Sequence, residues 1–182
     1  DNILTSPDQM WFNLIVKERG GNIVRNDSSS GSTIGYTGYD SADNSNSSLS
    51  FIVRLENLIS KGYFTQNKID MVFVLGGTND SWCGAHLGEE MYSGWTKNDL
   101  FKVRPAICYF YCRLREVLPN AEIYGIANHY NMKQEVIDTI INATEHVNGK
   151  SVKLNNVNMT SSHPSILGMQ QIKDQVLAVF DR

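Results

Sequence analysis

The chain has 182 residues, of which 41% are hydrophobic and 19% are charged, as in ordinary globular domains. Its 16 basic and 19 acidic residues give a formal net charge of -3, so charge does not indicate a nucleic-acid partner. No stretch approaches the roughly 20 apolar residues of a membrane-spanning helix. We therefore expect a single globular domain over residues 1–182, with no membrane span.

The three cysteines cannot form a complete set of disulfides. Cys108 and Cys112 lie four residues apart in an expected helix, where their side chains are poorly placed to bridge each other. Cys83 follows Trp82 in a polar segment and lacks a nearby basic residue that would favour its thiolate. We expect three free thiols. We expect no metal site, because no spacing of His, Cys and Asp resembles a ligand set.

The first third of the chain alternates regular elements with polar loops. Apolar residues at helical spacing indicate two helices, and a short apolar run between them indicates a strand. Clusters of Ser, Asn, Gly and Asp mark two loops, whose small side chains leave backbone amides accessible. In chain order the sequence predicts a helix over 8–17, a strand over 22–25, loops over 26–33 and 35–48, and a helix over 49–60.

The middle of the chain holds an apolar strand that leads from Ile69 into the turn from Gly77 to Asp80. Open α/β folds place their chemistry at the carboxyl ends of such strands, so Asn79 in this turn is a candidate functional residue. A long polar segment follows over residues 80–98, and loops of this length are usually functional or mobile.

The remaining sequence again alternates helices and strands. A proline at position 105 predicts either the start of a helix or a kink within it. The alternation predicts a parallel sheet with helices on both faces. The expected elements are a helix over 99–117, a strand over 122–127, a helix over 134–147, a strand over 151–154 and a helix over 165–180.

Two further motifs accompany the turn from Gly77 to Asp80. Gly31 lies in a serine-rich loop near the start of the chain, and His163 precedes Pro164 ahead of the last helix. In these residues, and in their order over nearly the whole chain, the protein resembles the SGNH (GDSL-type) serine hydrolases. That family has a Gly-Asp-Ser nucleophile turn, a glycine after the second strand, a Gly-x-Asn-Asp turn after the third, and Asp-x-x-His near the end.

The resemblance implies a three-layer, flavodoxin-like α/β fold, an esterase or lipase activity without any cofactor, and a small-molecule or carbohydrate ester as substrate. It also favours a secreted or periplasmic location. The backbone amide of Gly31 and the side-chain amide of Asn79 would stabilise the oxyanion of the tetrahedral intermediate. His163 would act as general base and then as general acid.

The chain departs from the family pattern in two places. Thr160 stands where the family has its acid, so a Ser-His dyad, a backbone carbonyl or a carboxylate from elsewhere must take over the task of orienting His163. The Gly-Asp-Ser block is missing; Asp40-Ser41 is its nearest imitation, but no apolar strand precedes it. We expect the nucleophilic serine and the first strand to lie upstream of Asp1.

In the family that first strand lies inside the sheet, between the second and third strands. Its absence would leave two rows of backbone donors and acceptors without partners. We therefore expect the strand to come from another fragment or another chain, and we expect the 182-residue chain alone to be inactive towards esters.

Each candidate residue also has a structural interpretation. Asn79 could cap a turn, Gly31 could serve a turn, and His163 could begin a helix without any chemistry. Asp80 could orient the loop or replace the missing acid. The aromatic residues after Asn79 could bind substrate or pack the loop; Trp82, Trp95 and Tyr130 are the candidate substrate-binding residues, with Tyr92 and Asn131 beside them.

Three functions fit these features. The first is a serine esterase that releases an acyl or acetyl group, in which Gly31, Asn79 and His163 assist an upstream serine. The second is a binding module that holds a carbohydrate or acyl ligand without turnover, which Thr160 and the missing serine favour. The third is a nucleotide or flavin binder, but the chain lacks the glycine-rich or lysine loop that would receive phosphates.

Overall fold

The computed structural model describes residues 3–180, which fall into two compact units. One unit is continuous and comprises residues 27–153; the other joins the described residues up to 26 to those from 154 onward. We call them the central unit and the terminal unit. The expectation of a single domain stays a prediction.

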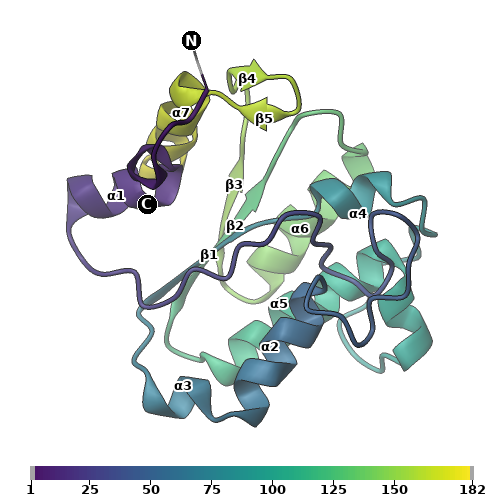
Figure 1. Ribbon diagram of the computed structural model, residues 1–182. Helices are drawn as coiled ribbons and strands as arrows, with labels where there is room; N and C mark the ends of the chain where they lie inside the picture. The colour runs from purple at the N-terminus through teal and green to yellow at the C-terminus, as the bar shows by residue number, and fades with distance from the viewer. Residues whose placement is uncertain (1–2, 181–182) are drawn as a thin grey trace. The chain divides into compact units, whose positions relative to one another are not determined.

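The central unit contains a parallel three-stranded sheet in the order β1-β2-β3 (Figure 1). The strands are β1 (Met71–Leu75), β2 (Glu122–Ala127) and β3 (Lys150–Lys153). In their register Val74 lies opposite Gly125, which in turn lies opposite Ser151. The predicted parallel α/β sheet is thus confirmed. Within the described residues the sheet ladder pairs β1 with β2, which places β1 at one end of the sheet.

Helices α5 (Val103–Val117) and α6 (Gln134–His146) pack against each other, and α6 lies along β2 and β3. Helix α2 (Phe51–Ser60) packs on α5, and α3 (Tyr63–Gln66) follows it. The close approach of α6 to the sheet requires a glycine in β2, because a Cβ at Gly125 would lie 1.8 Å from the hydroxyl of Thr144.

The terminal unit is built on two helices, α1 (Trp11–Arg19) and α7 (Ile166–Leu177), which pack against each other. A short 3₁₀ helix, η1 (Pro7–Gln9), precedes α1. Lys173 of α7 forms an ion pair with Glu18 of α1 at 2.6 Å. Before α7, β4 (Met159–Thr160) and β5 (His163–Pro164) form a small antiparallel hairpin that the sequence does not predict.

The strand expected over residues 22–25 is wrong. This segment is irregular and not a strand, with Ile23 and Val24 exposed to 42% and 51%. An apolar run becomes a strand only where a neighbour takes up its backbone groups.

The polar segment after β1 is more ordered than the sequence predicts. It begins with α4 (Thr78–Trp82) and ends in a 3₁₀ helix, η2 (Lys97–Phe101). Helix α5 therefore starts at Val103, so Pro105 lies in its first turn, where a missing N–H costs no helical hydrogen bond. Pro105 consequently marks the start of the helix.

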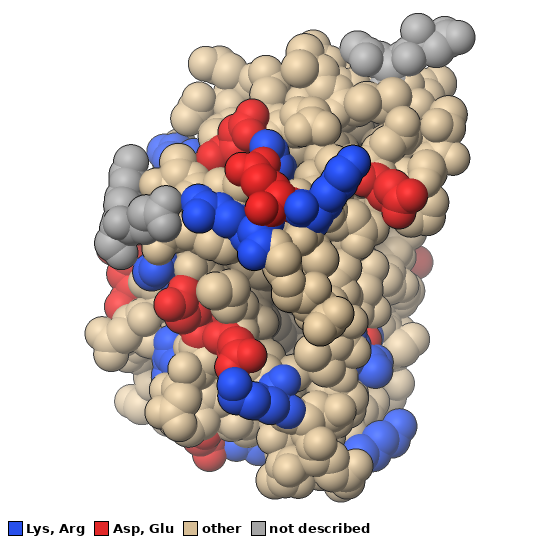
Figure 2. Space-filling model, turned by 90° about the vertical axis from the view of Figure 1, so that its left-hand side faces the viewer, with Lys and Arg blue, Asp and Glu red and all other residues tan. Residues whose placement is uncertain are grey.

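The described surface carries both charges, and Figure 2 shows acidic and basic side chains interspersed on the face drawn. Between residues 3 and 180 no helix is long and apolar enough to cross a bilayer. All three cysteines are free thiols, as expected, and Cys83 and Cys108 are buried.

Candidate active site

The turn after β1 places Asn79 at the carboxyl end of the sheet. Gly77 has a φ of +91°, in the left-handed region, and a Cβ there would lie 2.7 Å from the Cδ1 atom of Ile140. Both facts require a glycine. Since α4 begins at Thr78, directly after this glycine, Asn79 lies in its first turn.

The structure brings two of the predicted site residues together. The Asn79 Nδ2 atom donates a hydrogen bond to the carbonyl oxygen of Ser32 at 2.8 Å, and Ser32 directly follows Gly31. A primary amide has two donor hydrogens, so this bond leaves one available. Gly31 has a φ of +74° and is exposed, and its amide makes no hydrogen bond with residues 3–180.

Asp80 fixes the segment that follows Gly31. Its carboxylate is 3% exposed; both oxygens accept from the Ile34 amide at 2.9 Å, and Oδ1 also accepts from the Gly35 amide at 3.1 Å. Burial raises the pKa of Asp80 to about 6, against the opposing effect of these hydrogen bonds. The geometry favours loop positioning over the role of the missing acid, because both oxygens are occupied by backbone amides.

Arg54 of α2 holds the loop from the other side, and the sequence did not single it out. Its Nη1 atom donates to the Ser32 hydroxyl at 3.0 Å, and its Nε atom pairs with the Asp27 carboxylate at 3.0 Å. A lone arginine on an amphipathic helix gives no sequence signal for such a role. Gly31 thus lies in a loop bound by Arg54 and, through Ile34, by Asp80.

The loop after β2 lies beside α4. The Trp82 indole N–H donates to the carbonyl of Asn131 at 2.8 Å, and the Lys133 amide donates to the Ser81 hydroxyl at 2.7 Å. Tyr130, which is half-buried, precedes Asn131. Two of the three candidate substrate-binding residues, Trp82 and Tyr130, therefore belong to segments that meet next to Asn79.

The third candidate, Trp95, makes different contacts. Its ring packs edge-on against Tyr109 of α5 at 5.4 Å, and its N–H donates to the carbonyl of Met91 at 2.9 Å. Tyr92 stacks on His146 of α6 with the ring centroids 3.8 Å apart. These contacts favour the structural interpretation of Trp95 and Tyr92.

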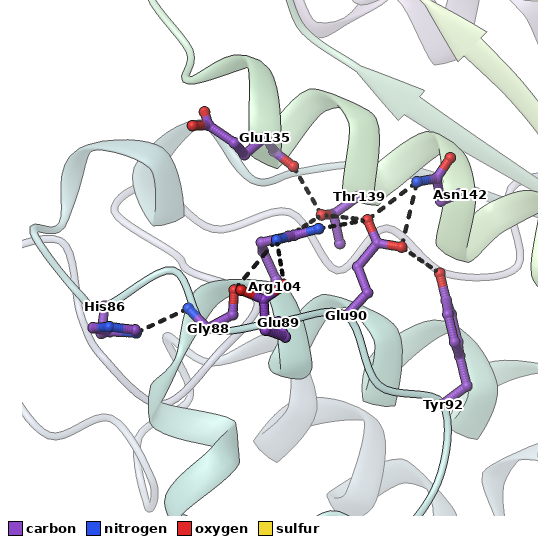
Figure 3. Close-up of polar contacts among 9 residues, drawn as sticks. All are labelled: His86, Gly88, Glu89, Glu90, Tyr92, Arg104, Glu135, Thr139 and Asn142. Carbon is purple, nitrogen blue, oxygen red and sulfur yellow. Dashed lines mark hydrogen bonds and ion pairs between the residues drawn. The ribbon is translucent and has the colours of Figure 1, made fainter.

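A polar network centred on Glu90 ties the same segment to α5 and α6 (Figure 3). The Glu90 carboxylate accepts from Arg104 at 3.2 Å, from Thr139 at 3.0 Å, from Asn142 at 3.1 Å and from Tyr92 at 3.0 Å. Burial acts to raise the pKa of Glu90, but these donors together lower it. The network explains how a polar segment of this length stays ordered.

His163 belongs to the terminal unit, where it lies in β5 and is exposed. Its Nδ1 atom lies 3.2 Å from the hydroxyl of Ser162, and Thr160 is its partner in the β4–β5 ladder. Ser162 is thus the side chain that contacts the imidazole, a residue that the sequence did not single out. Across residues 3–180 no group of three or more His, Cys, Asp or Glu could hold a metal ion.

Ser41 is engaged elsewhere. Its hydroxyl donates to the carbonyl of Cys83 at 3.1 Å, and its φ of +67° places it in a tight turn within a loop. This geometry differs from the strand-to-helix turn that the family uses to present its serine.

Comparison with known proteins defines the family to which the chain belongs. A model of the GDSL-like lipase/acylhydrolase family matches residues 1–180. The chain is therefore a member of the GDSL-like lipase/acylhydrolase family, which confirms the resemblance and supports a hydrolase role.

Two solved structures are particularly similar to the chain. A candidate GDSL-like lipase from Bacteroides uniformis ATCC 8492 is 38% identical, with a TM-score of 0.87, covering 99% of this chain and 79% of that chain. A candidate GDSL-like lipase from Bacteroides ovatus ATCC 8483 is 36% identical, with a TM-score of 0.86, covering 98% and 81% respectively. A comparison with curated proteins found no match.

Proposed function

We propose that the protein is a serine ester hydrolase whose oxyanion hole is formed by the Gly31 amide and the Asn79 side chain. The hydrogen bond from Asn79 to Ser32 carries this proposal, because it joins the turn of one donor to the loop of the other. The contacts of Arg54 with Ser32 and of Asp80 with Ile34 support a loop that is held before the substrate binds. Such preorganisation is what makes an oxyanion hole effective.

In the proposed reaction a serine oxygen attacks the ester carbonyl while His163 accepts the serine proton. The carbonyl oxygen becomes an oxyanion that accepts hydrogen bonds from Gly31 and Asn79. The protonated His163 then gives its proton to the leaving alcohol, and water releases the acyl group by the same steps. Ser162 is the group proposed to orient the imidazole through Nδ1.

The serine itself is proposed to come from outside these 182 residues, on a strand that pairs with β1. The position of β1 at one end of the described parallel sheet supports this step, because a further strand of a sheet is added at an end strand. An added apolar strand would end beside the turn that carries Asn79.

The alternative is a binding protein that holds a carbohydrate or acyl ligand without turnover. One observation favours it: Thr160 occupies the acid position, and the side chain in contact with His163 is the neutral Ser162. Without a carboxylate the imidazolium formed in the reaction would be less stabilised.

A serine-reactive fluorophosphonate distinguishes the two functions. The complete gene product should be labelled if it is an esterase, and labelling should fall sharply in the His163→Ala variant. A folded protein that resists labelling is a binder. Conversely, ester hydrolysis by the purified 182-residue chain that disappears with His163→Ala would overturn the external serine.

A further inference from the structure

An exposed tyrosine lies against Trp82, one helical turn beyond Asn79. Tyr39 is 53% exposed, and its ring centroid lies 6.4 Å from that of Trp82 with the planes at 61°. In the described central unit, Met71 is the only other large apolar side chain with comparable exposure, at 44%. Single exposed apolar residues are common, but an open aromatic pair beside a candidate oxyanion donor indicates a ligand contact.

The segment that carries Tyr39 is a tight hairpin. The Gly38 amide donates to the carbonyl of Ala42 at 2.8 Å, and the Asn44 amide donates to the carbonyl of Tyr36 at 2.7 Å. Tyr39 therefore lies at the tip, where its ring projects from a defined turn.

Two side chains anchor this hairpin to the rest of the central unit. The Thr37 hydroxyl donates to the carbonyl of Phe101 at 2.8 Å, and the Ser41 hydroxyl donates to the carbonyl of Cys83 at 3.1 Å. Because Cys83 directly follows α4, the second anchor fixes the position of Tyr39 relative to Trp82. A ring held in place loses little entropy when it binds a ligand.

The polar groups of the two rings differ in whether they already form a hydrogen bond. The Trp82 N–H is already bonded to Asn131, so the half-buried ring, and not the N–H, is the part that a ligand would contact. The Tyr39 hydroxyl makes no hydrogen bond with residues 3–180, so it is available as donor and acceptor. The pair thus combines an apolar surface with a free hydroxyl.

We propose that Tyr39 and Trp82 form a subsite for a carbohydrate ring, which is the alcohol part of the ester. This inference rests on the proposed function, since it assigns the sugar to the esterase site. A pyranose has an apolar C–H face for the rings and hydroxyl groups at its edge for Tyr39. The surroundings of this pair are polar and include Asp40, Ser41 and Asn131. An acyl chain forms no hydrogen bonds with such groups, whereas the hydroxyl groups of a sugar do.

Binding to the 182-residue chain tests the subsite independently of catalysis. The ¹⁵N-labelled protein is titrated with a mono-O-acetylated methyl xylopyranoside and, separately, with glycerol monoacetate and phenyl acetate. The indole N–H signal of Trp82, assigned with Trp82→Phe, should shift and saturate with the pyranoside. Tyr39→Ala should weaken that binding by about 3- to 10-fold, as expected for the loss of one aromatic contact.

Two variants serve as controls. Tyr39→Phe keeps the ring and should weaken binding less than Tyr39→Ala, whereas Met71→Ala removes the other exposed apolar side chain and should leave binding unchanged. An unmoved Trp82 signal, or wild-type affinity in Tyr39→Ala, would overturn the subsite. A loss of glycerol monoacetate or phenyl acetate binding in Tyr39→Ala as large as that of the pyranoside would overturn its assignment to sugars.

The outcomes separate the two proposals. Pyranoside binding that depends on Tyr39, in a complete gene product that resists the fluorophosphonate, would leave the subsite standing and remove the esterase. Fluorophosphonate labelling without such binding would leave the esterase and remove the subsite.

Discussion

At the scale of single residues, Asn79 carries the most specific chemical expectation. In a protein that also carries the proposed serine, Asn79→Ala should lower kcat by about 10²- to 10³-fold with little change in KM, because the donor is proposed to act on the oxyanion. Steady-state kinetics on an acetyl ester measure this. Asn57→Ala, an exposed asparagine on α2, is the control and should retain wild-type turnover. A smaller loss from Asn79→Ala than tenfold would remove the residue from the oxyanion hole.

Asp80 makes a prediction about stability and pH. Its pKa is raised to about 6 in the folded protein, so the folded state keeps the proton while the unfolded state loses it near pH 4. The stability from this proton is full below about pH 4 and is lost as the pH rises through about 6. The loss is on the order of 3 kcal/mol.

Urea unfolding of the wild type and of Asp80→Asn at pH 4, 5, 6 and 7 measures this effect. The free energy of unfolding of the wild type should fall more steeply across this range than that of Asp80→Asn, in which the group cannot titrate. The contributions of the other carboxyl groups to the pH dependence cancel when the two proteins are compared. Parallel curves would show that Asp80 does not titrate in this range.

At the scale of elements, the Gly31 loop depends on α2 through Arg54. Arg54→Ala should remove the contacts to Ser32 and Asp27 and speed amide exchange at the loop by roughly 10-fold or more, as loss of a charged hydrogen bond suggests. Hydrogen exchange read by mass spectrometry would measure this. Arg113→Ala is a matched control, because it breaks the pair with Glu56 of α2 without touching the loop. Equal exchange of the Gly31 loop in both variants would contradict the role of Arg54.

The conformation of the segment from Gly84 to Trp95 depends on the carboxylate of Glu90. Glu90→Gln should lower the free energy of unfolding by about 1–3 kcal/mol, because it removes the charge that accepts from four donors. Glu89→Gln is the control: Glu89 pairs with the same Arg104, but its side chain is 93% exposed. Removal of the Glu89 charge should change the free energy of unfolding by less than about 0.5 kcal/mol. Chemical denaturation of both variants makes the comparison.

The elements also show how far sequence reasoning reaches. The strand over residues 122–127 was predicted with the bounds of β2, and the helix predicted over 49–60 ends at Ser60, as α2 does. Both predictions succeeded because the spacing of apolar residues reflects which side chains are buried. The strand predicted over 22–25 was wrong. Ile23 and Val24 suit a strand by residue type, but whether a strand forms depends on pairing with residues that are distant in the sequence. Helix α4 escaped prediction, because its sequence from Thr78 to Trp82 is short and polar.

In the candidate site, too, the sequence predicts some residues and misses the contacts between them. The sequence singled out Gly31 and Asn79, and the structure brings them together through Ser32. The contacts from Asp80 to Ile34 and from Tyr39 to Trp82 join residues more than 40 positions apart. Nothing in local composition encodes such pairs. They follow from the order of the strands and the packing of loops at one sheet edge.

At the scale of the whole molecule, the position of β1 at one end of the described sheet yields the last prediction. A strand with one unpaired edge exchanges the amides on that edge quickly, and a parallel partner would protect them. In the complete gene product we expect alternate amides of Met71–Leu75 to exchange at least about 10-fold more slowly than in the 182-residue chain. The amides of residues 124–126 in β2, which lie between β1 and β3, serve as the internal control. Unchanged exchange at β1 would mean that no added strand pairs there, and the serine would then have to reach Asn79 by another route.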